Sequence, residues 1–347
     1  MKYLKYPLYL LLLLVAIFLF ILIYGTLGDY KPDEQTIISE NPDAPALVDS
    51  AFNIMIWNIG YCGLSEKMDF FYDGGKGVRP DKSTSESNLQ AVLDYVATLD
   101  TFDFYLFQEA DVKSKRSYRI NQVEAIQERL ATVNISFGKN FEVFFNPVPP
   151  RAPLGKLRSG LASFSRHLPS SSIRYSFPGN YSWPMGVFML DRCFLVDRYH
   201  LAGGKELLVI NTHNSAYDDG SLRKAQMDYL HGFLTGEYDK GNYIIVGGDW
   251  NQTPYAFEPQ FEMDKFDTSQ LSYIEKDYLT GEWTWLYDPM IPTNRRVDIP
   301  YVSGVTRTTV IDYYLLSPNL EAIAVKGVNL KFINSDHQPV LASFKLK

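Results

Sequence analysis

The sequence predicts an α/β protein of the α+β kind, in which a two-sheet core is covered by helices and follows one N-terminal membrane helix. Three observations lead to this prediction. Residues 7–24 form a run without a single charge. Short apolar runs that end in polar or glycine-rich turns then recur along the chain, whereas only about three segments have the spacing of an amphipathic helix. This excess of strands argues against a doubly wound parallel sheet and suits two packed sheets.

Composition supports a globular domain and excludes several other classes of protein. Of the 347 residues, 46% are apolar and 21% are charged, which excludes disordered and fibrous chains. The formal net charge of −7 gives no overall attraction to nucleic acid or anionic lipid. The two cysteines, Cys62 and Cys193, are too few for a disulfide scaffold or a cysteine-rich zinc site.

The uncharged run is long enough to cross a membrane. About 20 apolar residues span a bilayer, whereas the apolar part of a cleaved signal peptide has roughly 7–15 residues. Lys2 and Lys5 precede the run, and Asp29 and Asp33 follow it. The positive-inside rule therefore places the N-terminus in the cytoplasm and the rest of the chain outside. Since no A-x-A-like cleavage site follows, we expect an uncleaved signal anchor over residues 1–28, with cleavage and secretion as the alternative.

Residues 29–50 are expected to be a linker. They contain Pro32, Pro42 and Pro45, several acidic groups and little periodicity. One globular domain is then expected over residues 51–347, and no internal repeat is visible in it.

Strands and helices alternate in the predicted domain. Strands are expected where apolar residues are continuous, at 52–57, 104–107, 207–210, 243–246, 310–316 and 340–344. A helix is expected over 89–99, after a capping box at Ser83 and Glu86, and another over 123–130. A third is expected over 221–233, with Ser221 as its cap and Gly236 as its stop.

Polar side chains that could take part in catalysis or binding follow these strands or lie at their ends. They are Asn58, Glu109, His213, Asp249, Asn251, Asp312, Asp336 and His337. Residues at strand ends face the rim of a sheet, where loops build sites on a rigid scaffold. We therefore expect all eight to converge on one rim.

The residue types in this set favour one kind of chemistry. Carboxylates and amides suit a hard cation, Mg²⁺ first and Mn²⁺ or Ca²⁺ as alternatives. A histidine beside such a cation can donate to a phosphoryl oxygen or move a proton. Together these groups predict metal-assisted hydrolysis of a phosphate ester. Each short motif alone is an ordinary turn or loop sequence, so the prediction depends on their joint occurrence in one order.

That order resembles the endonuclease/exonuclease/phosphatase superfamily, which has the deoxyribonuclease I-like fold. The matching motifs are WN at 57–58, QE at 108–109, NTH at 211–213, GDWN at 248–251, IDYYLLS at 311–317 and SDHQPV at 335–340. The resemblance implies a four-layer αββα sandwich of two mostly antiparallel sheets flanked by helices. It also implies a hydrolase acting on phosphate ester bonds, dependent on a divalent metal that is usually Mg²⁺.

The resemblance further implies a metal site. Glu109 would be the principal ligand, Asn58 would hold the metal or the phosphate beside it, and Asp336 would assist on the metal side. A further residue near the phosphate is expected between the QE and NTH motifs. The candidates are Arg158, Ser159, Arg166, Tyr181 and Arg192.

Catalytic roles are implied for five other residues. Asp249 would orient or deprotonate the attacking water, and Asn251 would hold the phosphate or that water. His337 would donate to the scissile phosphate, with Asp312 fixing its tautomer. His213 would be a second histidine that contacts the phosphate, as in deoxyribonuclease I and the neutral sphingomyelinases.

The substrate stays open at this point. Basic runs at 113–119 and 151–158 favour a nuclease, whereas aromatic residues at 175–188 and 273–301 can stack bases, meet a lipid interface or simply cover the core. Expected partners are therefore a nucleic acid, a phospholipid headgroup or a small phosphodiester, together with the membrane, for a monomeric chain. The alternatives are an extracytoplasmic nuclease and a sphingomyelinase-like phosphodiesterase. Outside this class stand a catalytically silent tethered binding protein and an unrelated carbohydrate-active or carbohydrate-binding domain.

Overall fold

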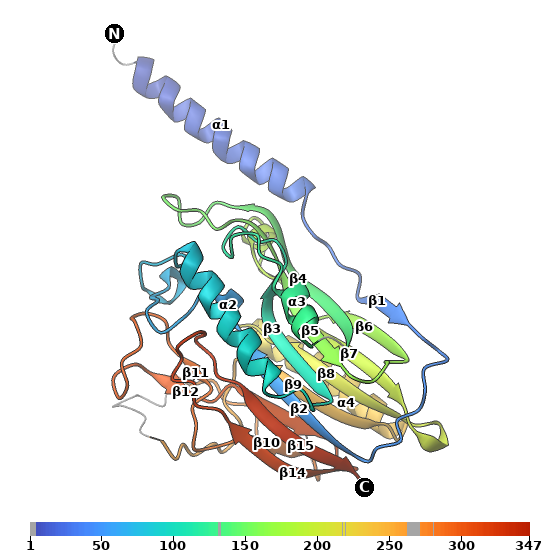
Figure 1. Cartoon of the computed structure of the whole chain (residues 1–347). Helices are drawn as coiled ribbons and strands as arrows, with labels where there is room; N and C mark the ends of the chain where they lie inside the picture. The colour runs from blue at the N-terminus through green and yellow to red at the C-terminus, as the bar shows by residue number, and fades with distance from the viewer. Residues whose placement is uncertain (1–4, 131–132, 217, 219, 262–270, 280) are drawn as a thin grey trace.

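The computed structural model describes residues 5–130, 133–216, 218, 220–261, 271–279 and 281–347, and Lys2 of the predicted anchor lies outside them. One long helix, α1 (Lys5–Leu27), extends away from a domain that contains two β-sheets (Figure 1). Three further helices cover that domain, α2 (Lys82–Ala97), α3 (Gln122–Leu130) and α4 (Ser221–Asp239). Short 3₁₀ helices lie in its loops, η1 (Gly60–Cys62), η2 (Phe71–Asp73), η3 (Met185–Phe188) and η4 (Ala202–Gly204).

The described strands form two large sheets and one small ribbon. The first sheet has the order β1-β6-β7-β8-β9-β13-β10. Its strands are β1 (Gln35–Glu40), β6 (Ser171–Ser176), β7 (Cys193–His200), β8 (Glu206–His213), β9 (Tyr243–Asp249), β13 (Asp312–Leu316) and β10 (Thr284–Leu286). The second sheet has the order β14-β15-β2-β3-β5-β4. Its strands are β14 (Leu320–Gly327), β15 (Val340–Leu346), β2 (Ala51–Asn58), β3 (Phe104–Asp111), β5 (Gly155–Ser165) and β4 (Asn134–Asn146). The ribbon pairs β11 (Asn294–Arg295) with β12 (Thr308–Thr309).

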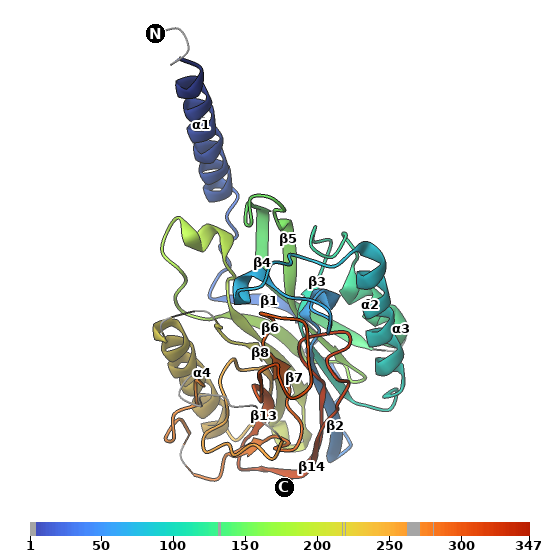
Figure 2. The same ribbon diagram turned by 90° about the vertical axis from the view of Figure 1, so that its left-hand side faces the viewer.

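The two sheets pack face to face between layers of helices. Helices α2 and α3 lie over the second sheet and α4 lies over the first (Figure 2). Only β2–β3 and β8–β9 are parallel among the described strand pairs, and the others are antiparallel. The predicted four-layer αββα sandwich of mostly antiparallel sheets is confirmed.

Strand β2 shows why the central strands are apolar throughout. Ile54 and Ile56 face the first sheet and join the core between the sheets. Met55 and Trp57 point the opposite way, into the core beneath α2 and α3. Because successive side chains of a strand alternate between its faces, a strand covered on both faces needs a continuous apolar run.

A third core lies beneath α4 and takes in one of the two aromatic segments. Leu230 and Leu234 of α4 pack there with Trp250, whose ring stacks on Tyr313 at a centroid distance of 5.4 Å. Trp285 packs edge-on against the Trp250 ring at 5.5 Å. The described aromatic residues of segment 273–301 that pack in this core therefore cover the core.

Three predicted ends of two helices are wrong. Helix α2 begins at Lys82, before the predicted capping box, because the Asp81 carboxylate accepts a hydrogen bond from the Thr84 amide at 2.8 Å and so caps the helix. Helix α4 begins at Ser221, but Gly220 occupies the cap position, and the helix runs through Gly236 to Asp239. Its last turn is held by Glu237, which pairs with Arg198 at 2.7 Å, so Gly236 does not stop it.

Part of the predicted linker is a strand of the first sheet. Strand β1 pairs antiparallel with β6, and the ring of Tyr30 lies 3.6 Å from the Lys139 ammonium. The Ser176 hydroxyl donates to the Asp33 carbonyl at 2.7 Å. The chain between α1 and the domain is therefore attached to the domain surface, and the domain boundary at residue 51 stays a prediction.

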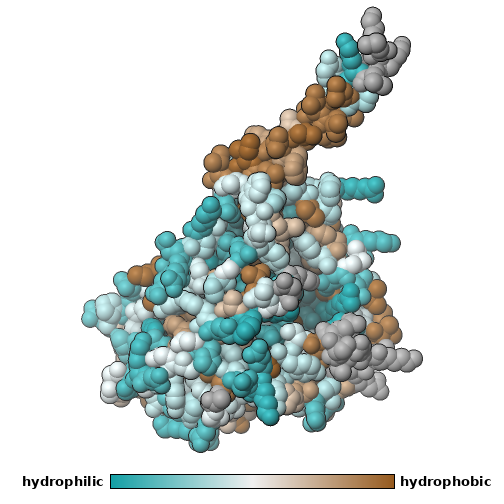
Figure 3. Space-filling model, turned by 180° about the vertical axis from the view of Figure 1, so that it is seen from behind, coloured by the Kyte–Doolittle hydropathy of each residue, from teal (hydrophilic) through white to brown (hydrophobic). Residues whose placement is uncertain are grey.

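Helix α1 is exposed along almost its whole length. It has 23 residues and rises about 34 Å at 1.5 Å per residue, against a hydrocarbon core of about 30 Å. The helix is strongly apolar where it is seen from behind (Figure 3). Among the described residues, α1 is the one helix that is long and apolar enough to cross a membrane. A membrane span and a signal sequence both have this length and composition.

Candidate functional site

Parallel strand pairs bring the predicted residues to one edge of the sandwich. Asn58 ends β2 and lies opposite Gln108 of the parallel strand β3. His213 ends β8 and lies opposite Asp249 of the parallel strand β9. Asp249 also faces Asp312 across the antiparallel pair β9–β13. Because carboxyl ends of parallel strands share an edge, these side chains meet there.

Two glycines before Asp249 allow close contacts, Gly247 with the opposite sheet and Gly248 with the neighbouring strand β8. A Cβ added to Gly247 would lie 2.7 Å from the Ile56 side chain of the opposite sheet. Gly248 has φ of +147°, and a Cβ there would lie 2.1 Å from the Thr212 carbonyl oxygen. Only glycine fits this conformation and contact.

Asp249 is buried at the centre of a polar network that spans both sheets. The amide of Asn58 donates to its Oδ2 atom at 3.0 Å. The backbone amide of Asn251 donates to Oδ1 at 2.9 Å. Two histidine Nε2 atoms also face Oδ2, that of His213 at 3.4 Å and that of His337 at 3.8 Å. One carboxylate oxygen is therefore surrounded by an amide and two imidazoles.

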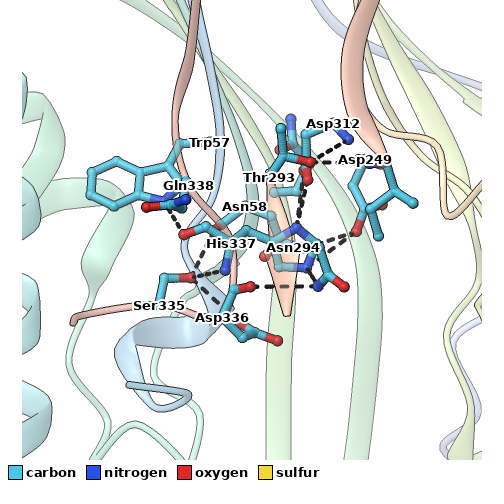
Figure 4. A network of polar contacts seen from close by, with 12 residues as sticks. Trp57, Asn58, Asp249, Thr293, Asn294, Asp312, Ser335, Asp336, His337 and Gln338 are labelled. Atoms are coloured by element: carbon cyan, nitrogen blue, oxygen red, sulfur yellow. Dashed lines mark hydrogen bonds and ion pairs between the residues drawn. The ribbon is translucent and has the colours of Figure 1, made fainter. Parts of the chain in front are cut away.

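His337 is held by contacts on both sides of its ring (Figure 4). Its Nδ1 atom lies 2.8 and 3.0 Å from the two carboxylate oxygens of Asp312. Its Nε2 atom lies 3.0 Å from the amide nitrogen of Asn294. The indole of Trp57 donates to the His337 carbonyl at 3.1 Å, and the Ser335 hydroxyl accepts from the His337 amide at 3.2 Å. Backbone and side chain of this residue are thus both fixed.

Asn251 and Glu109 adopt backbone conformations that aim their side chains. Asn251 has φ of 51°, a left-handed conformation that asparagine tolerates better than most residues, and its amide donates to the Asn214 carbonyl at 2.9 Å. Glu109 has φ of 55° and lies where the β3–β5 register shifts, between Phe107 and Ala110. A bulge of this kind redirects a side chain out of the strand pattern.

Asp336 approaches the same place from the loop before β15. A Cβ added to Gly60 would lie 2.6 Å from the Asp336 Oδ1 atom, and Gly60 itself has φ of +47°. The Ser335 hydroxyl lies 3.5 Å from Oδ1. Glycine at position 60 therefore leaves room for the Asp336 carboxylate.

A cavity of about 720 Å³ opens over this edge. Six of the eight predicted residues line it, namely Glu109, His213, Asp249, Asn251, Asp336 and His337. Asn58 and Asp312 are fully buried behind the cavity wall, where they hold Asp249 and His337. The structure thus brings all eight predicted residues together.

Burial and neighbouring charges shift several pKa values in the site. Burial raises the pKa of Asp249 to about 6, against the opposing effect of His337. Burial also raises the pKa of Asp336 to about 7. Burial alone would lower the pKa of His337, but the Asp312 and Asp249 carboxylates outweigh it and raise that pKa well above its usual value. Burial and the charge of Arg192 lower the pKa of His213, so the two histidines are suited to opposite protonation states.

Tyr61 and Arg116 also line the cavity, although neither was predicted as a site residue. The Tyr61 hydroxyl is buried in the cavity wall and has no hydrogen-bond partner among the described residues. The Arg116 guanidinium lies 3.9 Å from the Tyr61 ring centre, 2.9 Å from Asp111 and 3.8 Å from Glu109. The sequence shows Arg116 only as one member of a basic run and Tyr61 only as a loop aromatic, so neither carried a distinguishing signal.

Some of the candidates predicted near the phosphate line the cavity, and others do not. Ser159, Tyr181 and Arg192 line the cavity, whereas Arg158 and Arg166 are not among its lining residues. Arg295 also reaches the cavity wall, but its guanidinium donates to the carbonyls of Ser65 at 2.7 Å and of Ile299 at 3.2 Å. It therefore joins two loops beneath the site.

The arrangement separates a hard-cation side from a histidine side. Asp249, Asp312 and His337 are close enough together to be considered as metal ligands. However, both Asp312 oxygens already face the His337 Nδ1 atom, which favours a hydrogen-bonded chain over a ligand set. Glu109 and Asp336 offer carboxylate oxygens to the same cavity, which suit Mg²⁺. The predicted ligand Asn58 does not line the cavity, and its amide oxygen accepts from the Gly60 amide at 3.0 Å.

Comparison with known proteins gives a family match and a shared fold. The model of the endonuclease/exonuclease/phosphatase family matches residues 55–337. A search of curated proteins found no match.

Solved structures with this fold cover most of the chain. An endonuclease/exonuclease/phosphatase from Beutenbergia cavernae is 17% identical, with a TM-score of 0.56 over 86% of this chain and 72% of that one. TDP2 from D. rerio, in complex with a single-stranded DNA product, is 14% identical, with a TM-score of 0.53 over 86% of this chain and 100% of that one. ANGEL2, a 2′,3′-cyclic phosphatase bound to adenosine-2′,3′-vanadate, is 15% identical, with a TM-score of 0.56 over 91% and 99%. At these identities the likeness shows the fold alone.

Proposed function

The chain belongs to the endonuclease/exonuclease/phosphatase family of phosphoester hydrolases, and from this we propose that it is a membrane-anchored, Mg²⁺-dependent enzyme that hydrolyses a phosphodiester. The observation that carries the proposal is the Asp312–His337 pair facing Asp249 in one cavity with Glu109 and Asp336. Family members depend on a divalent metal, and the residues of this site fit one.

The fit to a metal follows from the donor atoms. Glu109 and Asp336 are carboxylates beside one cavity, and burial raises the pKa of Asp336 to about 7. A bound cation would offset the cost of ionising that buried carboxylate. Glu109 and Asp336 would hold the ion from the cavity. The Asn58 amide oxygen lies behind them and accepts a hydrogen bond from the Gly60 amide at 3.0 Å, so Asn58 would support the site and not bind the ion. When bound, Mg²⁺ would polarise a phosphoryl oxygen and neutralise the charge that develops there.

Asp249 is suited to accept a proton from the attacking water. Its pKa of about 6 leaves it ionised at neutral pH yet basic enough to take up a proton. Asn58 and Asn251 hold its two oxygens in place. His213, whose pKa is lowered, faces the same carboxylate as a neutral imidazole and can position the water or a phosphoryl oxygen.

His337 is suited to donate a proton or a hydrogen bond to the phosphate. The Asp312 carboxylate faces Nδ1, so the other nitrogen, Nε2, lies on the cavity side, 3.0 Å from the Asn294 amide nitrogen and 3.8 Å from the Asp249 carboxylate. Donors that are fixed before reaction stabilise developing negative charge without reorganisation. The overall reaction adds water to phosphorus, breaks one phosphorus–oxygen ester bond and protonates the leaving oxygen.

The location follows from α1 and the charges around it. Lys5 begins the helix and acidic residues such as Asp29 follow it, which supports a cytoplasmic N-terminus and an extracytoplasmic catalytic domain.

Hydrolysis of bis-p-nitrophenyl phosphate by the full chain in detergent with Mg²⁺ tests the proposal. We expect Asp249→Ala and His337→Ala each to lower kcat by roughly 10²–10⁴-fold, the usual contribution of a general acid or base. His200→Ala and Asp228→Ala are matched controls, because both residues lie outside the cavity lining. A near wild-type rate in either site variant would show that the assignment is wrong.

A further inference from the structure

The segment 177–192, which joins β6 to β7, contacts both α1 and the catalytic cavity. The Trp183 indole donates to the Thr26 hydroxyl of α1 at 3.1 Å. A Cβ added to Gly25 of α1 would lie 3.0 Å from the Val187 side chain, so helix and segment touch. The same segment supplies an apolar wall of the cavity through Tyr181, Met185, Phe188, Met189 and Leu190.

The β4–β5 hairpin forms a second connection between the helix and the cavity. The ring of Tyr24 in α1 lies 4.4 Å from that of Phe144. Phe141 and Leu154 of this region line the cavity and pack in one cluster with Phe188. Two walls of the catalytic cavity therefore extend to the end of the membrane helix, as the position of the hairpin below α1 indicates (Figure 2).

Exposed apolar side chains gather where these walls meet the helix. Trp183 is 65% exposed, Met185 57%, Phe144 52% and Val148 39%. We call these four residues the apolar rim. Exposed apolar groups of this size beside a membrane helix are typical of a surface that enters the headgroup region of a bilayer, where tryptophan is enriched.

The orientation of the domain relative to α1 is constrained. Tyr30 contacts Lys139, the Asp33 carbonyl accepts from the Ser176 hydroxyl, and the Glu34 carbonyl accepts from the Ser176 amide at 2.8 Å. Since these contacts begin three residues after α1 ends, the domain has little freedom to swing. The apolar rim therefore stays next to the bilayer that holds α1.

We propose that the apolar rim rests on this bilayer and that the cavity takes a phospholipid from it, with the phosphodiester at the catalytic residues and the aliphatic part against the apolar wall. This inference rests on the proposed function. Water adds to the lipid phosphorus, one phosphorus–oxygen ester bond breaks, and the leaving oxygen takes up a proton. The products are an alcohol and a phosphomonoester, one of which keeps the acyl chains.

The full chain reconstituted in vesicles tests the proposal with two kinds of substrate. The vesicles contain phosphatidylcholine, phosphatidylglycerol and sphingomyelin with long acyl chains, and bis-p-nitrophenyl phosphate is added to separate samples. We expect hydrolysis of at least one vesicle lipid. Phe144→Glu and Trp183→Glu should lower that rate by about tenfold or more, because a charge opposes insertion into the interface, and should leave hydrolysis of the soluble diester within about twofold.

Ile323→Glu is the matched control. Ile323 is 53% exposed but belongs to β14, at the end of the domain opposite α1 (Figure 1), so this variant should behave as wild type with both substrates. Hydrolysis of the soluble diester without hydrolysis of any vesicle lipid would overturn the inference and leave the proposed function standing. Rim variants that cleave vesicle lipid at the wild-type rate would also overturn it. Failure with both substrates would reject the proposed function itself.

Discussion

The Nδ1 atom of His337 lies 2.8 Å from the nearer carboxylate oxygen of Asp312, and both residues are buried. The two come from different segments, the loop before β15 and the start of β13. The contact leaves the opposite ring nitrogen, Nε2, facing Asp249 at 3.8 Å. We therefore propose that Asp312 positions His337.

Asp312→Asn tests this positioning role. The asparagine amide would favour the wrong imidazole tautomer, so we expect kcat to fall by roughly 10³–10⁴-fold, as in the analogous substitution of a catalytic triad. KM should change far less, and the melting temperature should stay close to that of wild type because the two side chains have the same shape. Asp228→Asn, at a residue with 63% side-chain exposure, is the control. An equal loss of kcat and of folded protein would indicate a structural role instead.

Metal removal tests the Glu109 side of the site. We expect EDTA to abolish turnover and Mg²⁺ or Mn²⁺ to restore it. Loss of an outer-shell partner lowers metal affinity by roughly 10–100-fold. Glu109→Gln should therefore raise the Mg²⁺ concentration that gives half-maximal activity by at least that factor. Glu128→Gln, on the exposed face of α3, should leave this concentration unchanged. Full activity in EDTA would rule out the mechanism.

Tyr61→Phe separates activity from stability. The Tyr61 hydroxyl is buried in the cavity wall without a described hydrogen-bond partner, so its removal should not destabilise the fold and should slightly raise the melting temperature. If the hydroxyl donates to the bound phosphate, kcat/KM should fall by about tenfold, the value of one ordinary hydrogen bond. Tyr255→Phe, at a 39% exposed residue, should change neither quantity. An unchanged kcat/KM in Tyr61→Phe would exclude the contact.

Asp197 gives the fold a pH dependence away from the catalytic site. Burial raises its pKa from 3.8 to about 6, although the Ser136 hydroxyl donates to it at 2.6 Å. The folded chain therefore retains a proton that the unfolded chain releases. The resulting stability is present below about pH 4 and is lost as the pH rises through about 6.

The variant Asp197→Asn mimics the protonated form at every pH. Its free energy of unfolding should exceed that of wild type by up to about 3 kcal/mol at pH 8, and the gain should vanish near pH 4. Denaturant unfolding in detergent at both pH values measures the difference. Asp94→Asn, at a residue with 62% side-chain exposure, is the control. A gain that is independent of pH would contradict the assignment.

The anchor can be tested by fractionation and mass. We expect the mature protein to keep its full mass of 39.7 kDa and to remain in membranes after carbonate extraction. Leu14→Arg, in the middle of α1, should weaken insertion by roughly 2.5–3.5 kcal/mol, whereas Leu27→Arg at its end should have little effect. A protein that lacks residues 1–28 would indicate a cleaved signal peptide.

Sequence reasoning could group the eight candidate residues because each lies in or next to a recognisable strand. The central strands are covered on both faces, so continuous apolar runs such as 52–57 identify them. Strand β4 was missed because it alternates apolar with polar residues and includes Gly138. Strand β7 was missed although residues 193–196 are as continuously apolar as the predicted strands.

Tertiary contacts explain what the sequence could not indicate. The φ of 44° at Tyr61 and its contact with Arg116 depend on loops more than 50 residues apart. The attachment of residues 30–40 to the domain depends on β6, far along the chain, so a proline-containing segment was expected to be a linker.

The register of β9 against β13 places Asp249 directly opposite Asp312. A slip of one residue would turn one of these carboxylates to the other face of the sheet and would separate His337 from one of its two acidic neighbours. A misaligned strand pair could still bury its apolar residues, yet it could not turn over substrate. Catalytic rate therefore serves as a sensitive assay of correct strand alignment. It can rank refolded or engineered forms of the chain that a spectroscopic measure of β content would not distinguish.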